Sequence, residues 1–339
     1  MKLDFNKIKE ITAGAARVAE CESGVTFFRF TDKEEEYYFK SSPNGFYKKT
    51  FSTAGVRMSF KTDSKKLCLS VSTFASSSRS YFGIDVSVNG KVIGGIYNHE
   101  DKEMVGNYTP VECPLGTFSK EFELGDGKKD VIIYLPWSVA ITLHELSLDD
   151  GAICESIKRD KLLIAYGDSI THGYDALYPS NRYISKLSDA LGAEEINKAI
   201  GGDVFQPELA ECAADLTPDY VTVAYGTNDW GKRDKDSYFE NCRDFYTIIS
   251  KKYPNAKIFA ITPIWRKDCD EERRGGRFFE LEPRIAKAIE GLPNVTIIPG
   301  IDLVPKDELM YADLRLHPND EGFEHYFKNL LAEIKNYLV

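Results

Sequence analysis

The stretch Leu162-Leu163-Ile164-Ala165-Tyr166-Gly167-Asp168-Ser169 decides the fold class of this chain. Its first five residues are apolar and do not alternate with polar ones, which predicts a short strand covered on both faces. A polar turn, Gly167-Asp168-Ser169, follows directly, and a helical pattern begins near Asn181. A strand of this kind followed by a helix is typical of a parallel α/β sheet.

The same order of strand and helix repeats as far as the C-terminus. Four more stretches are strand candidates, at residues 195–200, 220–224, 257–261 and 295–298. Helical patterns predict helices at residues 181–191, 207–214, 237–252, 278–290 and 320–338. Residues 153–339 are therefore expected to form a doubly wound parallel sheet of five strands, which places its functional site at the carboxyl ends of the strands.

The preceding residues, 1–152, have the pattern of an all-β domain. Leu67, Leu69 and Val71 alternate with polar or small residues, the period of a half-buried strand. Asn89-Gly90 suits a tight hairpin turn, because both central residues of a type I′ turn need positive φ. Many short strands joined by polar turns predict a β-sandwich or jelly roll.

Length and charge limit the classes of function. A chain of 339 residues fits two domains, and its net charge of −10 argues against nucleic acid and anionic membranes as partners. It has no apolar run long enough to span a bilayer and no apolar signal core at the start, so we expect a cytoplasmic protein. The seven dispersed cysteines form no CxxC pair, which favours reduced thiols over disulfides or a zinc site.

Polar clusters follow three of the predicted strands. Ser169 lies at a strand-to-helix turn, where its hydroxyl is exposed and its N–H lies at a positive helix end. Gly202, in Gly-Gly-Asp, lets an ester approach the backbone, and Asn228, in Gly-Thr-Asn-Asp, offers an amide donor for an oxyanion. His317, before Pro-Asn-Asp, supplies a base for serine activation.

Each cluster alone also has an ordinary structural interpretation. Gly-Asp-Ser and Gly-Gly-Asp occur in many turns, Asp or Ser there can simply cap a helix, and a lone His-Pro is usually a loop. Four such clusters in this order, three of them at successive strand ends, are much harder to obtain by chance. The set therefore predicts a serine hydrolase.

Together these clusters resemble the four signature blocks of the SGNH (GDSL-type) hydrolases: Gly167-Asp168-Ser169, Asn197 through Gly202-Asp203, Gly226-Thr227-Asn228-Asp229, and His317-Pro318-Asn319-Asp320. The resemblance implies a flavodoxin-like strand order. It implies Ser169 as the nucleophile, His317 as the base, and an oxyanion hole made of the Ser169 N–H, Gly202 and Asn228. The first half also resembles the jelly-roll domains that precede some carbohydrate esterases of this type.

One position departs from the family pattern. The family usually has an aspartate three residues before the histidine, where this chain has Leu314, and Asp313 lies four residues before. In a turn of helix, positions i+3 and i+4 point to nearly the same face, so Asp313 is expected to orient His317 and complete a triad. If it does not, a backbone carbonyl would hold the imidazole and the enzyme would use a Ser–His dyad.

Further residues near these blocks are candidates for other roles. Asp168 and Trp230 are candidates for contact with substrate, although Trp230 suits a core position equally well. His172 is expected to be an exposed residue of the first helical turn, and Arg182 either to contact the Ser169 helix or to face solvent. The remaining histidines are expected to be surface or packing residues, and no cluster has the spacing of metal ligands.

The expected reaction is hydrolysis of a short acyl ester, most simply an acetyl ester on a carbohydrate, without metal or cofactor. Transfer of the acyl group to an acceptor alcohol is an alternative, and a non-catalytic carbohydrate-binding protein on the same scaffold is another, supported only by the displaced aspartate. The expected partner is a small-molecule or saccharide ester, and the sequence leaves the question of a homo-oligomer open.

Overall fold

In a computed structural model that describes residues 1–338, the apolar run at 162–166 lies in strand β12 (Lys161–Gly167) of a five-stranded parallel sheet. The strand order is β13-β12-β14-β15-β18, the flavodoxin-like order in which the second strand lies outside the first. The other strands are β13 (Ala193–Asn197), β14 (Tyr220–Ala224), β15 (Lys257–Ile261) and β18 (Val295–Ile298). The predicted fold class is therefore confirmed for this half of the chain.

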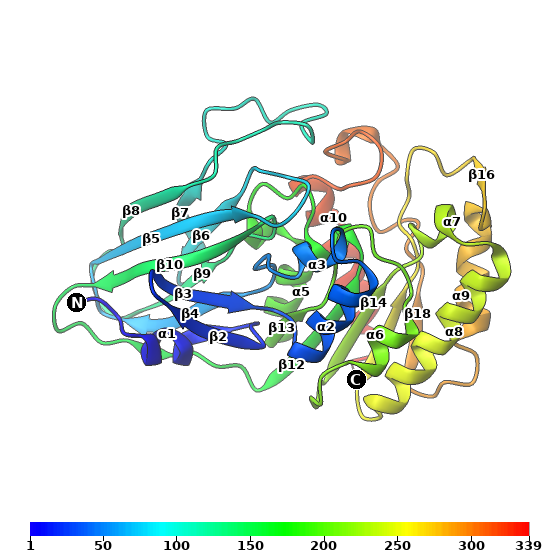
Figure 1. Cartoon of the computed structure of the whole chain (residues 1–339), viewed down its shortest axis with the longest axis horizontal. Coiled ribbons are helices and arrows are strands. Elements are labelled where there is room, and N and C mark those ends of the chain that lie inside the picture. The colour runs from blue at the N-terminus through cyan, green and yellow to red at the C-terminus, as the bar shows by residue number, and fades with distance from the viewer. Residues whose placement is uncertain (339) are drawn as a thin grey trace.

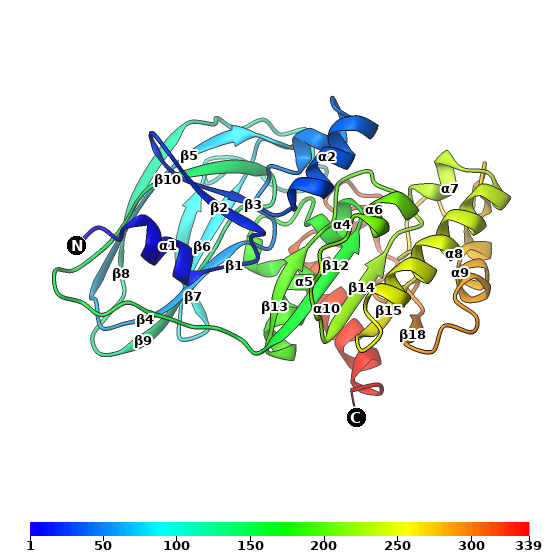
Figure 2. The same cartoon turned by 60° about the horizontal axis from the view of Figure 1, so that its bottom comes forward.

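Helices cover both faces of this sheet (Figures 1 and 2). Leu163 and Ala165 of β12 pack with the helices of one face, whereas Ile164 and Tyr166 pack with those of the other, which explains the apolar run without alternation. The first face carries α5 (Tyr183–Leu191) and α10 (Asp320–Lys335). The second carries α6 (Pro207–Glu211), α8 (Lys235–Lys252) and α9 (Leu281–Ala288).

The first half of the chain is a sandwich of two antiparallel sheets, as predicted. One sheet has the order β1-β4-β9-β6-β7, with β11 also paired to β4, and the other has the order β2-β3-β10-β5-β8. Leu67, Leu69 and Val71 of β5 are buried between the sheets, while the residues between them are partly exposed. The strands of the first sheet are β1 (Thr12–Ala13), β4 (Arg57–Thr62), β6 (Gly83–Val88), β7 (Lys91–Tyr97), β9 (Lys129–Tyr134) and β11 (Glu155–Ser156). Those of the second are β2 (Arg17–Cys21), β3 (Gly24–Phe28), β5 (Lys66–Ala75), β8 (Thr117–Glu123) and β10 (Val139–Leu148).

This half also contains helices, which the strand patterns did not predict. It contains the helices α1 (Phe5–Ile11), α2 (Asp32–Ser41) and α3 (Phe46–Lys49). A signal for α2 is present in the sequence: Thr31 and Glu34 form a capping box, in which each side chain accepts from the other residue's backbone N–H. Figure 2 shows α2 beside α6, so this helix joins the sandwich to the second half of the chain.

Buried charges fix the sandwich to the parallel sheet. Lys198, which follows β13, forms a 2.6 Å ion pair with Glu34 of α2, and both side chains are buried. The buried guanidinium of Arg29 donates to the carbonyl oxygens of Asn197 and Ala199. Since a buried charge without a partner is costly, the loop after β13 is held by the first half of the chain.

The remaining elements are short and lie at the carboxyl edge of the sheet or in the connections after it. They are α4 (Ser169–His172), α7 (Asp229–Lys232), the hairpin β16 (Glu272–Arg273) with β17 (Gly276–Arg277), and three 3-10 turns, Pro179–Asn181, Phe278–Glu280 and Glu308–Met310. No helix of residues 1–338 has the length and apolar character that crossing a bilayer requires. The seven cysteines are all free thiols.

Candidate active site

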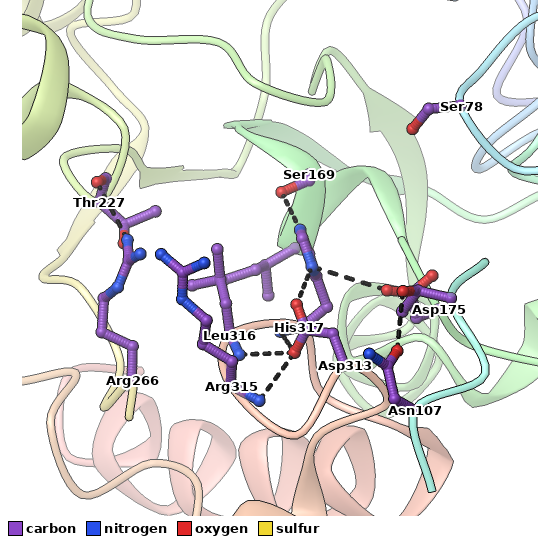
Figure 3. Close-up of polar contacts among 12 residues, drawn as sticks. Ser78, Asn107, Ser169, Asp175, Thr227, Arg266, Asp313, Arg315, Leu316 and His317 are labelled. Atoms are coloured by element: carbon purple, nitrogen blue, oxygen red, sulfur yellow. Dashed lines mark hydrogen bonds and ion pairs between the residues drawn. The ribbon is translucent and has the colours of Figure 1, made fainter. Parts of the chain in front are cut away.

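Ser169 begins the one-turn helix α4 directly after β12. Gly167 is required before it, because a Cβ at this position would lie 2.3 Å from Oγ1 of Thr171. The carboxylate of Asp168 accepts the Ile170 N–H at 3.0 Å and caps the turn. Oγ of Ser169 lies 2.8 Å from Nε2 of His317, so the predicted nucleophile and base are within hydrogen-bond distance (Figure 3).

Asp313 reaches His317 as expected, but through a different backbone conformation. Its Oδ2 lies 2.8 Å from Nδ1 of His317, while Oδ1 accepts the backbone N–H groups of Arg315, Leu316 and His317. Burial by itself would raise the pKa of Asp313, but the hydrogen bonds from the His317 ring and the backbone hold it well below its usual range. A carboxylate that stays ionised can orient the imidazole and stabilise its protonated form.

The segment between Asp313 and His317 is a tight loop and not the turn of helix that the sequence suggested. The Ala312 N–H donates to the His317 carbonyl at 2.8 Å, and Tyr311 pairs with Pro318 as in a hairpin. Leu314 has φ +55°, in the left-handed region. The loop therefore accommodates one residue more than the family spacing while the carboxylate still contacts the ring.

A second carboxylate near His317, that of Asp175, was not found by sequence reasoning. Its Oδ2 lies 3.6 Å from Nδ1 of His317, and the residue has φ +73°. Arg79, from the sandwich half, pairs with the same carboxylate at 2.7 Å, and the Tyr81 hydroxyl donates to it. Tyr108, also from that half, donates to the Asp175 carbonyl. No signal in the sequence links these residues, because they meet only when the two halves dock.

The expected oxyanion donors lie in loops at the same edge of the sheet. Within residues 1–338, the backbone N–H groups of Ser169 and Gly202 have no protein acceptor. Gly202 has φ +89°, which other residues rarely adopt. The Asn228 amide donates one N–H to the Asp203 carbonyl at 3.0 Å, and its second N–H remains available. These donors can stabilise a negative oxygen, the chemistry that ester cleavage needs.

His172 is fully buried, which corrects the expectation that it faces water. Its Nδ1 accepts the Gly201 N–H at 3.2 Å, and Nε2 lies 2.8 Å from the Ser52 hydroxyl and 2.9 Å from the Trp137 carbonyl. Burial, followed by the nearby Arg29, holds the pKa of His172 well below its usual value. The neutral ring therefore fixes the loop that contains Gly202.

The two residues expected to contact substrate are both inside the protein. The indole of Trp230 donates to the Gly276 carbonyl at 2.7 Å and is fully buried under the Arg273 guanidinium. Asp168 is 2% exposed, and burial raises its pKa to about 6. The structure therefore does not present either side chain to a substrate. Arg182 is also buried, in an ion pair with Glu195 at 2.9 Å.

Asp175, Asp313 and His317 place three ligand-type atoms within 4.8 Å of one another, the arrangement of a metal site. The contacts of these atoms favour hydrogen bonding instead. Arg79 and Tyr81 occupy the Asp175 carboxylate, backbone N–H groups occupy Asp313, and His317 contacts Ser169. A cation here would have to displace the protein's own positive charge.

Comparisons with known proteins indicate the family and the fold. Residues 165–325 match the model of the GDSL-like lipase/acylhydrolase family. No curated protein sequence matches the chain. Among solved structures, a salicylyl-acyltransferase from a tetracycline biosynthetic pathway is 22% identical, with a TM-score of 0.81 over 97% of this chain and 94% of that one.

Two other solved structures have the same fold over their whole length. A putative GDSL-like lipase from Bacteroides ovatus is 20% identical, with a TM-score of 0.76 over 100% of this chain and 98% of that one. An acetyl xylan esterase from the rumen bacterium Butyrivibrio proteoclasticus is 16% identical, with a TM-score of 0.64 over 100% and 98%. At these identities the likeness shows the shared architecture of sandwich and parallel sheet.

Proposed function

Residues 165–325 form a domain of the GDSL-like lipase/acylhydrolase family, and from this premise we propose that the protein is a serine esterase for short acyl esters, acetyl esters of carbohydrates first among them. The observation that carries the proposal is the continuous contact from Ser169 through His317 to Asp313, with 2.8 Å at each step. The alternative of a non-catalytic protein rested only on the displaced aspartate, so this contact supports the esterase over that alternative.

In the proposed mechanism, Nε2 of His317 takes the proton of the Ser169 hydroxyl as the serine oxygen attacks the ester carbonyl. The N–H groups of Ser169 and Gly202 and the amide of Asn228 stabilise the oxyanion. The protonated His317 then gives its proton to the leaving alcohol. Water, deprotonated by the same ring, releases the acid and restores Ser169.

A carbohydrate substrate is supported by the surroundings of the site. A groove of about 700 Å³ lies in the sandwich half, lined in part by Ser77, Ser78, Arg79 and Thr109. Figure 3 shows Ser78, from the sandwich half, on the side of Ser169 where Asp175 lies. Side-chain hydroxyl groups both donate and accept hydrogen bonds, which suits them to contact a sugar.

The test is a screen of acetylated sugars and 4-nitrophenyl esters of increasing acyl length. Ser169→Ala is the blank, and Ser119→Ala, in the exposed face of β8, is the matched control. We expect hydrolysis of acetyl esters that is lost in Ser169→Ala and retained in Ser119→Ala. Equal rates for Ser169→Ala and the unaltered protein would reject the proposal.

Acyl transfer to an acceptor alcohol is the second candidate, favoured by the similarity to the salicylyl-acyltransferase. Both reactions share the acyl-enzyme and differ in whether water or an alcohol resolves it. Product analysis with and without sugar acceptors separates them. An acylated acceptor formed in preference to free acid would favour transfer.

A further inference from the structure

Two lysines from distant parts of the chain meet at the loop that carries the Gly202 N–H. Lys49, in α3 of the sandwich half, donates from Nζ to the Gly201 carbonyl at 2.5 Å. Lys232, in α7, donates to the Gly202 carbonyl at 2.5 Å. Both ammonium groups lie 5.6 Å from the centre of the Phe46 ring, and they contact the carbonyl oxygens of two consecutive residues.

Gly202 is open toward this region. A Cβ at this position would have only Cε1 of Phe46 at 3.6 Å and Nζ of Lys49 at 3.9 Å as neighbours. The space beside the expected oxyanion donor is thus bordered by an aromatic ring and an ammonium group. A substrate whose carbonyl contacts the Gly202 N–H would pass within reach of these lysines.

Neither lysine has a carboxylate partner. Among residues 1–338, no Asp or Glu oxygen lies within 4.0 Å of Nζ of Lys49 or Lys232, although the chain carries a net charge of −10. Burial, followed by repulsion from Lys232, lowers the pKa of Lys49, so the two positive charges oppose each other. Each ammonium uses one N–H on a glycine carbonyl and has two more to donate.

The acidic residues of the neighbouring blocks are buried and do not face an incoming molecule. Asp203 is held by the Tyr38 hydroxyl and the Val204 N–H, and burial raises its pKa to about 6. Asp229 is also fully buried, and burial raises its pKa to about 7. Lys232 is exposed and Lys49 is partly exposed. The charged groups that border the space beside Gly202 are therefore positive.

We propose that Lys49 and Lys232 bind an anionic group, a carboxylate or a phosphate, carried by the ester substrate of this site. The inference rests on the proposed esterase function and adds the charge class of its substrate. An anion between the two ammonium groups would relieve their mutual repulsion and take up their remaining N–H groups. The anion belongs either to the acyl part or to the alcohol part of the ester.

The experiment compares matched anionic and neutral esters at low ionic strength. For the acyl part the pair is 4-nitrophenyl hydrogen succinate and 4-nitrophenyl pentanoate. For the alcohol part it is an acetyl ester of methyl glucuronoside and the same ester of methyl glucoside. We expect kcat/KM to favour the anionic member of one pair by about tenfold or more, and this preference to fall as salt is added.

The variant Lys49→Gln/Lys232→Gln removes both charges and keeps an amide donor for each glycine carbonyl. We expect it to lower the ratio of anionic to neutral kcat/KM about tenfold, while Lys49→Arg/Lys232→Arg keeps the ratio. Lys48→Gln is the matched control, because Lys48 lies in the same turn and is exposed. It should leave the ratio unchanged.

Three results would overturn the inference: equal rates for both members of both pairs, a preference for neutral esters, or an equal fall for both members in Lys49→Gln/Lys232→Gln. The last would mean that the lysines only support the glycine loop. If no ester at all is cleaved, the proposed function fails separately. Calorimetry of succinate and glucuronate with Ser169→Ala then decides the inference: binding that depends on both lysines supports it, and weak or unchanged binding rejects it.

Discussion

The carboxylate of Asp175 lies 3.6 Å from Nδ1 of His317, beside the closer carboxylate of Asp313 at 2.8 Å. The imidazole N–H thus faces two acidic groups from separate loops. Arg79 and Tyr81 occupy the Asp175 carboxylate, whereas the donors to Asp313 within residues 1–338 are N–H groups of its own loop and of the His317 ring. Asp313 is therefore the direct partner of His317, and Asp175 adds a second, partly neutralised charge.

Replacement of Asp313 tests whether the enzyme uses a triad. In Asp313→Asn we expect kcat/KM for 4-nitrophenyl acetate to fall by about 10²–10³, because a neutral amide neither stabilises the imidazolium nor selects the correct tautomer. Steady-state kinetics beside Ser169→Ala measure the effect. A loss of only a few fold would contradict the triad and indicate a Ser–His dyad.

Replacement of Asp175 tests whether its charge contributes to the rate or only to the stability of the protein. We expect Asp175→Asn to lower kcat/KM about tenfold and also to lower the Tm, since it leaves the guanidinium of Arg79 without its carboxylate. The pair Asp175→Asn/Arg79→Met removes both charges and should recover much of the Tm without recovering the rate. Recovery of the rate together with the Tm would show that Asp175 acts only on stability.

The left-handed backbone of Leu314 makes a distinct prediction. Glycine adopts this conformation freely, so Leu314→Gly should keep kcat/KM within about twofold of the unaltered protein. Leu314→Val should destabilise the loop by about 1–2 kcal/mol and lower kcat/KM, because β-branched residues disfavour positive φ. Thermal unfolding and kinetics of the two variants are the measurement; an inactive Leu314→Gly with an active Leu314→Val would contradict the loop geometry.

The buried ring of His172 holds the loop that contains Gly202, so its replacement should lower the rate of ester hydrolysis. His172→Phe leaves the Gly201 N–H without its acceptor, which costs about 1–3 kcal/mol of stability. We expect kcat to fall about tenfold with a smaller change in KM, because the loop carries an oxyanion donor. His325→Phe, on the partly exposed side of α10, is the control. Loss of stability with an unchanged kcat would show that the ring serves packing alone.

Burial of Asp229 predicts how stability depends on pH. Burial, opposed by Arg233 and the Phe205 N–H, raises its pKa to about 7, against about 4 in the unfolded chain. Between these values the folded protein holds one proton more, so this group lowers the free energy of unfolding as the pH rises from 4 to 7, by about 2–4 kcal/mol.

The variant Asp229→Asn should lose this part of the dependence. Its free energy of unfolding, from urea titrations at pH 5 and pH 8, should change less than that of the unaltered protein. The exposed Asp101→Asn should behave like the unaltered protein. An equal pH dependence in all three proteins would contradict the raised pKa.

Local sequence patterns were sufficient to predict the architecture. The apolar run at 162–166 predicted a central strand because a strand covered on both faces cannot alternate, and the period of Leu67, Leu69 and Val71 predicted a sheet with one buried face. Helix α2 was missed although its capping box is in the sequence, because its surface is mostly polar.

The sequence predicted those residues of the site that follow the ends of strands, and it did not predict the others. The contact between Ser169 and His317 agrees with the expectation from block order, since carboxyl ends of parallel strands share one edge. The position of Asp175 beside His317 and the burial of His172 depend on how the sandwich packs against the parallel sheet. The pattern of apolar residues along the chain does not predict this packing. Trp230 was ambiguous because an aromatic residue suits a core and a sugar platform equally well.

The ion pair between Glu34 and Lys198 binds distant stretches of the gene product to each other. Recombination that replaced one half by that of a remote relative without the matching residue would leave either Glu34 or Lys198 buried between the two halves without its partner. We therefore expect the two halves to be inherited together. A substitution on one side of the contact between them should be accompanied by a compensating substitution on the other side.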